Sequence, residues 1–444
     1  MKWSLLIAAL LLAAAPNQSR AEGRNDAARG CEDRQASALG RVSCELGLGL
    51  PKATGPLLVV VAEVASDQHA ERTEELARRL ATLVAGELGP LARANDRMLD
   101  LASAHRSAPR GVDLVVLSAR LGRDRFAVSA ELIPGARRFW ERFRPGLAGA
   151  SAHAHATRAP DAELMAYLPP IPLVLTRVDK ASALEEPSVA MACGDVDGDG
   201  ALEIVQVGRR KIMLGRLNRG KFQITASAPW ADLSRVSPRP LREPIASAAV
   251  YPGAGLEVGL SDRAEALRLD RSLRVIQRFP GRIPWPAGGC ANLTATGLSA
   301  ERAPCVSAAA GGEPESSIDT VAGARIVRRD GSALSVFASR RSNGQLELEF
   351  AGRRVAVPPA TVGAQLALGD LDGDGKPELL TTLDTPDPSR DALLVRTLSE
   401  DGSLREAFRV GVPSGVRSLA VCPHEGSALA PVVLGTGDGL WVVR

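Results

Sequence analysis

The stretch GDVDGDGALEI, residues 194–204, carries three aspartates on alternate positions and a glutamate soon after them. A calcium ion takes six to eight oxygen ligands at ~2.3–2.6 Å, and alternate residues of a tight loop can turn their carboxylates toward one point. Gly200 permits the sharp turn that such a loop needs. The predicted ligands are four carboxylates and one backbone carbonyl: Asp195, Asp197, Asp199, Glu203 and the carbonyl of Ala201.

The motif returns as GDLDGDGKPEL, residues 369–379, with all four acids in the same places. A motif that repeats at a distance indicates a repeat architecture. The alternatives to a calcium site are a solvated acidic turn and a catalytic carboxylate pair. A catalytic pair would need a base or nucleophile nearby, and the sequence offers none. The predicted ligands of the second motif are Asp370, Asp372, Asp374, Glu378 and the carbonyl of Lys376.

The position of the last acid excludes an EF-hand, which needs an acid at loop position 12 and a helix after the loop. Position 12 is Gln206 in one motif and Thr381 in the other, and the acid stands at position 9. The segments that follow, EIVQV and ELLTTL, are typical of strands. This loop between two strands resembles the FG-GAP and VCBS-type repeats of integrin α-subunits and many exported bacterial proteins. The resemblance implies a β-propeller of four-stranded blades in which the two loops hold two structural Ca²⁺ ions.

Weaker copies of the same pattern fill residues 172–444. SAAVYPGAGLEVGL and LAVCPHEGSALAPVVLG keep the strand–turn–strand shape of the motif, and a fifth unit begins at Cys290. Four further segments predict outer hairpins: KIMLGRLNRGKFQIT, AEALRLDRSLRVIQRF, SALSVFASRRSNGQLELEFA and DALLVRTLSEDGSLREAFRV. PLVLTRVD, residues 172–179, is a spare strand that we expect beside the final GLWVVR, where it closes the ring and removes exposed edges. We therefore expect a mostly β fold with five blades, and six as the alternative because residues 286–358 are long for one blade.

The N-terminus predicts export. The apolar run SLLIAALLLAAA is too short to span a bilayer and fits a secretory signal peptide over residues 1–21, with no later transmembrane span. In an oxidising compartment the six cysteines become disulfide candidates, although they allow 15 pairings and some could be free thiols. Cys31 and Cys44 are neighbours in sequence, as are Cys290 and Cys305. The propeller implied by the resemblance puts the remaining two, Cys193 and Cys422, on adjacent inner strands of the first and last blades.

The chain ahead of the propeller divides into three segments. Residues 22–55 show no period and are expected to be irregular. Residues 56–144 predict an α+β domain: a strand over 57–64, a helix after an N-cap at Asp67, a helix near 96–104 and the hairpin DLVVLSAR–FAVSAELI. Its pattern, ending in RFWERF, resembles the N-terminal domain of TolB and FlgO-like cell-envelope proteins. Residues 145–171 are rich in Ala, Gly and Pro and predict a linker, where His153 and His155 fall far short of a metal-ligand set.

Several function classes leave no signature in the sequence. The net charge is +3, which does not favour a nucleic-acid partner. Neither a nucleophile elbow, a P-loop nor an HExxH motif occurs, so no catalytic residue and no cofactor-binding residue is predicted. We expect a non-enzymatic, calcium-binding scaffold in the periplasm or at the cell surface, or secreted, whose partner is an envelope or surface protein. The alternatives are a propeller enzyme acting on polysaccharide, as lyase or hydrolase, and a calcium-dependent adhesin.

Overall fold

The computed structural model describes residues 30–31, 37–66, 70–135, 149–181, 185–218, 220–237, 244–251, 253–294, 297–299, 304–305, 318–350, 352–357, 362–399, 401–424 and 429–444. The chain divides into two compact units, Met1–Pro169 with Arg329–Ser332, and Pro170–Arg328 with Ala333–Arg444. The predicted signal peptide and the RFWERF segment lie outside the described residues. Among the helices described, none is long and apolar enough to cross a membrane.

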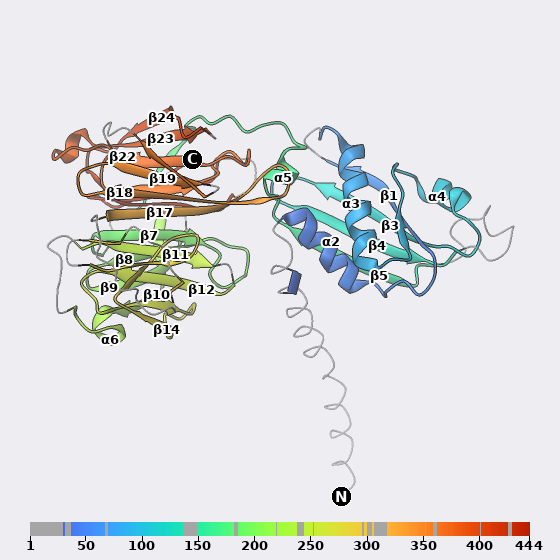
Figure 1. The fold of residues 1–444 in the computed structure, drawn as a ribbon, viewed down its shortest axis with the longest axis horizontal. Coiled ribbons are helices and arrows are strands. Elements are labelled where there is room, and N and C mark those ends of the chain that lie inside the picture. The colour runs from blue at the N-terminus through green and yellow to red at the C-terminus, as the bar shows by residue number, and fades with distance from the viewer. Residues whose placement is uncertain are drawn as a thin grey trace, which may run out of the picture. The chain divides into compact units, whose positions relative to one another are not determined.

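The first unit is built on a five-stranded mixed sheet in the order β2-β1-β3-β4-β5. β1 runs parallel to β2 and β3, and β3, β4 and β5 are antiparallel neighbours. The predicted hairpin is present as β3 and β4, with β4 at its expected bounds and β3 one residue longer. The elements are α2 (Ala38–Gly49), β1 (Leu57–Ala65), α3 (Thr73–Leu88), β2 (Ala92–Ala94), α4 (Leu101–Ser107), β3 (Asp113–Leu121), β4 (Phe126–Ile133), β5 (Ala152–Arg158) and α5 (Ala162–Met165). Figure 1 shows α2 and α3 lying together against this sheet.

Three expectations for this unit were wrong. Residues 22–55 are not irregular throughout, because α2 forms there and buries Leu39, Val42 and Leu46 on one stripe. Residues 145–171 are not a linker, because β5 pairs with β4 along AHAHATR and its alternating side chains are typical of an edge strand. The first long helix starts at Thr73 rather than after Asp67, which lies outside the described residues.

Two smaller differences concern the same unit. The second helix, expected near residues 96–104, is α4, and its N-cap is Asp100, whose carboxylate accepts from the Ser103 N–H at 2.7 Å. His153 and His155 lie on β5, where the His153 ring stands 3.7 Å from Glu131 and the His155 ring 2.9 Å from the Thr157 hydroxyl. Among the described residues they join no group of metal-ligating side chains.

The second unit is a five-blade β-propeller of four-stranded antiparallel sheets (Figure 1). Blade 1 is β7 (Ser188–Gly194), β8 (Glu203–Gly208), β9 (Lys211–Asn218) and β10 (Lys221–Pro229), followed by α6 (Trp230–Leu233). Blade 2 is β11 (Ala246–Tyr251), β12 (Gly255–Leu260), β13 (Glu265–Leu269) and β14 (Val275–Pro280). Blade 3 is β17 (Ile318–Val327), β18 (Ala333–Arg341), β19 (Leu346–Phe350) and β20 (Arg353–Val357). Blade 4 is β21 (Leu366–Gly369), β22 (Glu378–Thr382), β23 (Ala392–Leu398) and β24 (Leu404–Gly411), with a short turn of 3₁₀-helix at Pro388–Arg390. Blade 5 is β25 (Val416–Val421), β26 (Val432–Thr436), β27 (Leu440–Val443) and β6 (Val178–Ala181).

The predicted closure of the ring is confirmed, although the closing strand lies at Val178–Ala181 and not over residues 172–179. β6, from the start of the unit, pairs antiparallel with β27 from its end, so blade 5 contains both ends of the propeller. Shared apolar cores then join the blades in a ring: blades 1 and 2, blades 3 and 4, blades 4 and 5, and blades 5 and 1 each contribute side chains to one cluster. At the fifth junction, side chains of the segment between blades 2 and 3 pack with Ile245, just before β11, and with Phe337 of blade 3. Pairing with β6 covers the edge of β27, and closure of the ring packs the apolar faces of the first and last blades against each other.

Where the structure describes the segment between blades 2 and 3, it forms a short hairpin, β15 (Arg282–Pro284) with β16 (Cys290–Asn292), rather than a sixth blade. Trp285, between these strands, donates from its indole Nε1 to the Ala322 carbonyl at 2.9 Å and packs edge-on against Phe337 of blade 3. Of the unit expected to run from Cys290, the structure has β16, the second strand of this hairpin, and most of the residues after Ser299 lie outside the described part of the chain. SALSVFASRRSNGQLELEFA supplies the two middle strands of blade 3, β18 and β19, and not its outer hairpin.

All three expected disulfides are present: Cys31–Cys44, Cys193–Cys422 and Cys290–Cys305. Cys193 lies on β7 of blade 1 and Cys422 follows β25 of blade 5, so the second bond joins the first and last blades. Three disulfides are typical of a protein that folds in an oxidising, exported location.

Candidate metal centre

Each acidic motif forms the turn between the inner strand of a blade and the strand beside it. The first acidic loop, residues 195–203, joins β7 to β8, and the second acidic loop, residues 370–378, joins β21 to β22. In each loop the three aspartates offer one carboxylate oxygen apiece, and these oxygens lie within 4.8 Å of one another. The two convergent triads are Asp195, Asp197 and Asp199, and Asp370, Asp372 and Asp374.

Backbone N–H groups orient the first aspartate of each loop. Asp195 accepts from the Gly198 N–H at 2.7 Å and from the Gly200 N–H at 2.9 Å. Asp370 accepts from the Asp374 N–H at 3.1 Å and from the Gly375 N–H at 2.9 Å. The turn requires left-handed backbone at the glycines, with φ of +88° at Gly200 and +81° at Gly375. The hydrogen bonds that shape each loop therefore also bring its three carboxylates together.

The glutamate at the end of each loop accepts a hydrogen bond from the backbone of the same loop. Glu203 Oε2 accepts from the Val196 N–H at 2.8 Å, and Glu378 Oε2 accepts from the Leu371 N–H at 2.7 Å. Neither glutamate belongs to the group of carboxylate oxygens that lie within 4.8 Å of one another. The glutamates were predicted to close a calcium sphere, and in this structure each ties its loop to the strand that follows.

The two residues predicted to ligate through their carbonyls are also in the turns. The Ala201 N–H donates to Asp199 Oδ1 and the Lys376 N–H donates to Asp374 Oδ1, each at 2.8 Å. The two loops thus share this contact, although the residue that donates is alanine in one and lysine in the other.

The donor set fits a hard divalent cation. Three carboxylates that converge without a counter-charge repel one another, and oxygen donors are the ligands that calcium prefers. Burial, with repulsion from Asp372 and Asp374 added to it, raises the pKa of Asp370 to about 7 and that of Glu378 to about 9. A bound cation would relieve both effects, because it would stabilise the charged carboxylates. Calcium bound there would supply charge neutralisation and cross-linking of the loop.

The first acidic loop has a counter-charge of its own, which sequence reasoning missed. Arg216, on β9, places Nη2 2.8 Å from Asp199 Oδ2 and 3.5 Å from Asp197 Oδ1, and it also pairs with Glu203. Its hydrogen bonds to Asp199 and Glu203 raise the pKa of Arg216. The pKa of Asp199 is lowered by the Ala201 N–H and by Arg216. The sequence does place an arginine in β9, the second strand after the motif. Only the register between β8 and β9 shows that this arginine faces the acidic loop.

A glycine before each loop lets the next blade approach closely. A Cβ at Gly194 would lie 2.7 Å from Val250 Cγ1 of blade 2, and a Cβ at Gly369 would lie 2.5 Å from Val421 Cγ1 of blade 5. The next blade also contacts the loop backbone, through the Gly253 N–H on the Asp195 carbonyl at 3.2 Å and the His424 ring on the Asp370 carbonyl at 3.1 Å. Each acidic loop is thus part of a blade–blade junction.

The inner strands of all five blades line a central cavity of about 610 Å³. Most of its lining is alanine, valine and leucine, and its polar members are Ser247, Tyr251, Thr320, Arg325, Gln365, Asp370 and His424. The Tyr251 hydroxyl donates to Glu257 at 3.1 Å, and His424 contacts the Asp370 carbonyl as described above.

No family model and no curated protein matches this sequence. Similar solved structures include BBS1N in complex with ARL6DN, at 12% identity and a TM-score of 0.33, covering 62% of this chain and 96% of that one. The WD40 β-propeller domain of Doa1 has 12% identity and a TM-score of 0.34 over 61% of this chain and 95% of that one. AofleA from Arthrobotrys oligospora has 9% identity and a TM-score of 0.34 over 60% and 85%. At such TM-scores these likenesses support no common function, and the five-blade assignment follows from the strand pairings of the chain itself.

Proposed function

We propose that this protein is an exported, non-enzymatic scaffold: a calcium-stabilised β-propeller of the FG-GAP/VCBS type that binds a protein partner in the cell envelope or at the cell surface. The observation that carries the proposal is the pair of aspartate triads at equivalent turns of blades 1 and 4. Each triad lies at a junction with the next blade, so a cation there would strengthen the ring rather than act on a substrate.

The calcium role we propose is structural. Blades 2, 3 and 5 lack the aspartate triad and still form four-stranded sheets, so calcium is not needed to build a blade. Calcium would instead raise the free energy of unfolding of blades 1 and 4, because an ion that binds only the folded loop stabilises it by mass action.

The scaffold role is supported by the chemistry of the central cavity. Small apolar side chains dominate it, and the contacts of Tyr251 and His424 commit those side chains to neighbouring groups. Three disulfides and the predicted signal peptide support export, as does the resemblance of the first unit to TolB and FlgO-like envelope domains.

An affinity experiment tests partner binding. The mature full chain, with its disulfides intact, is immobilised and exposed to solubilised envelope of the native host, in calcium or in chelator, and bound proteins are cross-linked and identified. We expect one envelope protein to be retained in calcium and released by chelator, and to be lost with Asp372→Ala. Cleavage of envelope polysaccharide by the purified chain would contradict the non-enzymatic assignment.

A calcium-dependent adhesin is the second candidate, favoured by a cleft beside the second acidic loop. Asp372, Asp374 and Glu378 share this cleft of about 1020 Å³ with Phe350 and Arg405. Such a lining presents carboxylates, a guanidinium and an apolar ring to one ligand. Calcium-dependent attachment of the chain to intact cells, lost with Arg405→Ala at unchanged melting temperature, would favour the adhesin over the envelope scaffold.

A further inference from the structure

The Cys193–Cys422 disulfide lies close to both acidic loops, although these loops belong to blades 1 and 4. Cys193 stands two positions before Asp195, the first aspartate of the first acidic loop. Cys422 stands two positions before His424, whose ring contacts the Asp370 carbonyl of the second acidic loop at 3.1 Å. Blade 5 therefore connects the two loops, through the disulfide on one side and through His424 on the other.

The same part of blade 5 contacts the second acidic loop at a further backbone position. The Ala430 N–H donates to the Leu371 carbonyl at 2.8 Å, and both side chains are buried in one apolar cluster. The Cys422 N–H donates to the Pro431 carbonyl at 2.8 Å, which links the two ends of the segment between β25 and β26. Two consecutive carbonyls of the second loop, those of Asp370 and Leu371, thus contact residues close to this pair.

The first acidic loop contacts blade 5 by packing as well as through the disulfide. Leu202, near the end of this loop, packs against the apolar cluster that contains Cys422 and Ala420 of blade 5. Cys193 packs against the same cluster, and it pairs with Ile204 on the strand that leaves the loop. Both ends of the first loop are therefore in contact with the apolar surroundings of Cys422.

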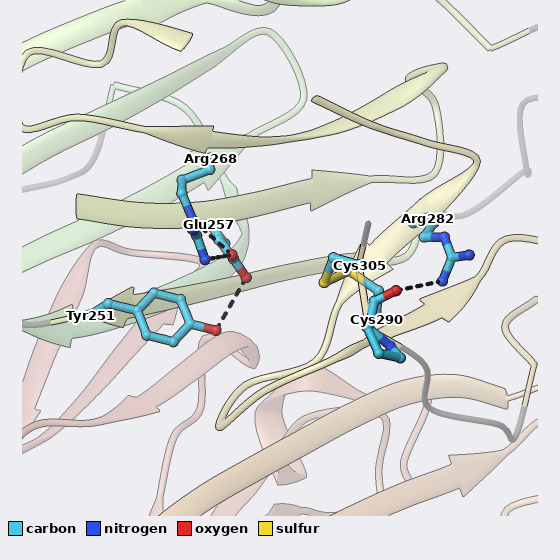
Figure 2. Close-up of a disulfide and its surroundings, with 7 residues drawn as sticks. Tyr251, Glu257, Arg268, Arg282, Cys290 and Cys305 are labelled. Atoms are coloured by element: carbon cyan, nitrogen blue, oxygen red, sulfur yellow. Dashed lines mark hydrogen bonds and ion pairs between the residues drawn. A yellow bond between two sulfur atoms is a disulfide. The ribbon is translucent and has the colours of Figure 1, made fainter. Parts of the chain in front are cut away.

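Blade 2 carries a tyrosine at the position equivalent to Cys422. Val250 and Val421 occupy equivalent places, because each lies against the glycine before an acidic loop. The residue after Val421 is Cys422, and the residue after Val250 is Tyr251. The Tyr251 hydroxyl donates to Glu257 of its own blade at 3.1 Å (Figure 2). At this position the side chain in blade 2 bonds within its own blade, whereas Cys422 bonds to the next blade of the ring.

We propose that the Cys193–Cys422 disulfide couples the two acidic loops, so that calcium bound at one loop raises the affinity of the other. The inference rests on the proposed calcium role, and it adds cooperation between the two sites. A cation orders the loop that binds it, and an ordered second loop fixes its contacts with His424 and Ala430. The disulfide extends that order to Cys193, so the first loop loses less conformational freedom when its own cation binds.

Calorimetric titration of the metal-free full chain with CaCl₂ measures the coupling. Asp372→Ala leaves the first loop to bind alone, and Asp197→Ala leaves the second loop to bind alone. If the loops were independent, the product of the two wild-type Kd values would equal the product of these two single-loop values. We expect the wild-type product to be smaller by about fivefold or more, which is the lower end of typical allosteric coupling.

Removing the bond by Cys193→Ser with Cys422→Ser should abolish the coupling. In this background the same set of titrations should give products that agree within about twofold, below the range of typical coupling. Cys290→Ser with Cys305→Ser is the matched control, because that bond also lies in the propeller but spans 15 positions of the segment between blades 2 and 3 (Figure 2). The control should keep the wild-type coupling.

A redox titration of the wild type keeps the test available if the serine variant does not fold. A small dithiol donates two electrons and two protons to the bond and closes to a cyclic disulfide, which leaves two protein thiols. Because coupling is reciprocal, calcium should lower the equilibrium constant for reducing Cys193–Cys422 by about fivefold or more. Thiol trapping with peptide mapping measures this constant, and the constant for Cys290–Cys305 should not change with calcium.

The outcomes separate the two proposals. Independent loops in a wild type that binds calcium, coupling that persists without the disulfide, or a reduction equilibrium that bound calcium leaves unchanged would overturn the role of this bond while the calcium role stands. A folded wild type that binds no calcium would overturn the calcium role itself.

Discussion

Cys193 on the inner strand of blade 1 is bonded to Cys422 at the end of the inner strand of blade 5, with their Cα atoms 4.8 Å apart. The bond spans 229 positions of sequence but joins strands that are neighbours in the ring. Together with the β6–β27 pairing it closes the propeller twice, once covalently near the central cavity and once by strand pairing in blade 5.

Removing this bond is expected to loosen the ring. Cys193→Ser with Cys422→Ser should lower the free energy of unfolding of the propeller by about 2–4 kcal/mol, because a cross-link over a long loop restricts the unfolded chain. Urea unfolding followed by tryptophan fluorescence measures the change, since Trp230, Trp285 and Trp441 are all buried in this unit. The control is Cys31→Ser with Cys44→Ser in the first unit, which should leave that transition in place. An unchanged midpoint in the first variant would show that strand pairing alone closes the ring.

The glycine before the second acidic loop is expected to tolerate no side chain. Gly369→Ala should destabilise the propeller by about 1–3 kcal/mol, because its Cβ would overlap Val421 of the next blade. Adding Val421→Ala should restore part of the loss, since it removes the overlapping methyl groups. Gly411→Ala is the matched control, because a Cβ there meets nothing within 4 Å. Equal urea midpoints for Gly369→Ala and Gly411→Ala would contradict the close approach of blades 4 and 5.

The first unit is expected to gain stability on mild acidification. Burial raises the pKa of Asp161, which accepts from the Ala38 N–H, and that of Glu163, which pairs with Arg79. The folded unit thus keeps protons that the unfolded chain, with ordinary pKa values of 3.8 and 4.5, has lost. Stability from these groups is full below those values and is lost as pH rises through the folded pKa values, by up to about 1.4 kcal/mol per pH unit for each group.

Hydrogen exchange of the full chain, corrected for the intrinsic pH dependence of exchange, measures this effect. Helices α2 and α5 should be better protected at pH 5 than at pH 7, and Glu163→Gln should reduce the difference. Helix α4 is the internal control. Its cap, Asp100, has a pKa lowered by the Ser103 N–H, so its contribution changes only at lower pH. Stronger protection of α2 at pH 7 than at pH 5 would contradict the buried acidic pair.

Much of the propeller could be predicted because its signals are local or periodic. The aspartate motif fixes a turn through hydrogen bonds within eleven residues, and its repetition identified blades 1 and 4. PLVLTRVD predicted a strand with no pairing partner nearby in the sequence, and the structure pairs its end, β6, with β27. The pairing of Cys193 with Cys422 then followed from the ring and did not need spacing rules.

The predictions that were wrong or incomplete concern features that depend on contacts between residues far apart in the sequence. AHAHATR looked like a linker because its small residues carry little hydrophobic signal, yet β4 supplies the pairing that makes it a strand. The β18–β19 hairpin has the same pattern as an outer hairpin, and only the preceding inner strand β17 shifts it one place inward. Arg216 was missed for the same reason, since its role depends on the β8–β9 register and not on the motif that it neutralises.

A thermal melt tests most directly whether calcium stabilises this propeller through the acidic loops. Unfolding of the full disulfide-bonded chain is followed by tryptophan fluorescence in excess calcium, in excess magnesium and in chelator. We expect calcium at about 100 times Kd to raise the melting temperature by about 5 °C or more over chelator, magnesium to do less, and Asp372→Ala to lose most of the gain. The same melting temperature in calcium and in chelator, for a wild-type chain that is folded in both, would contradict a stabilising role of calcium.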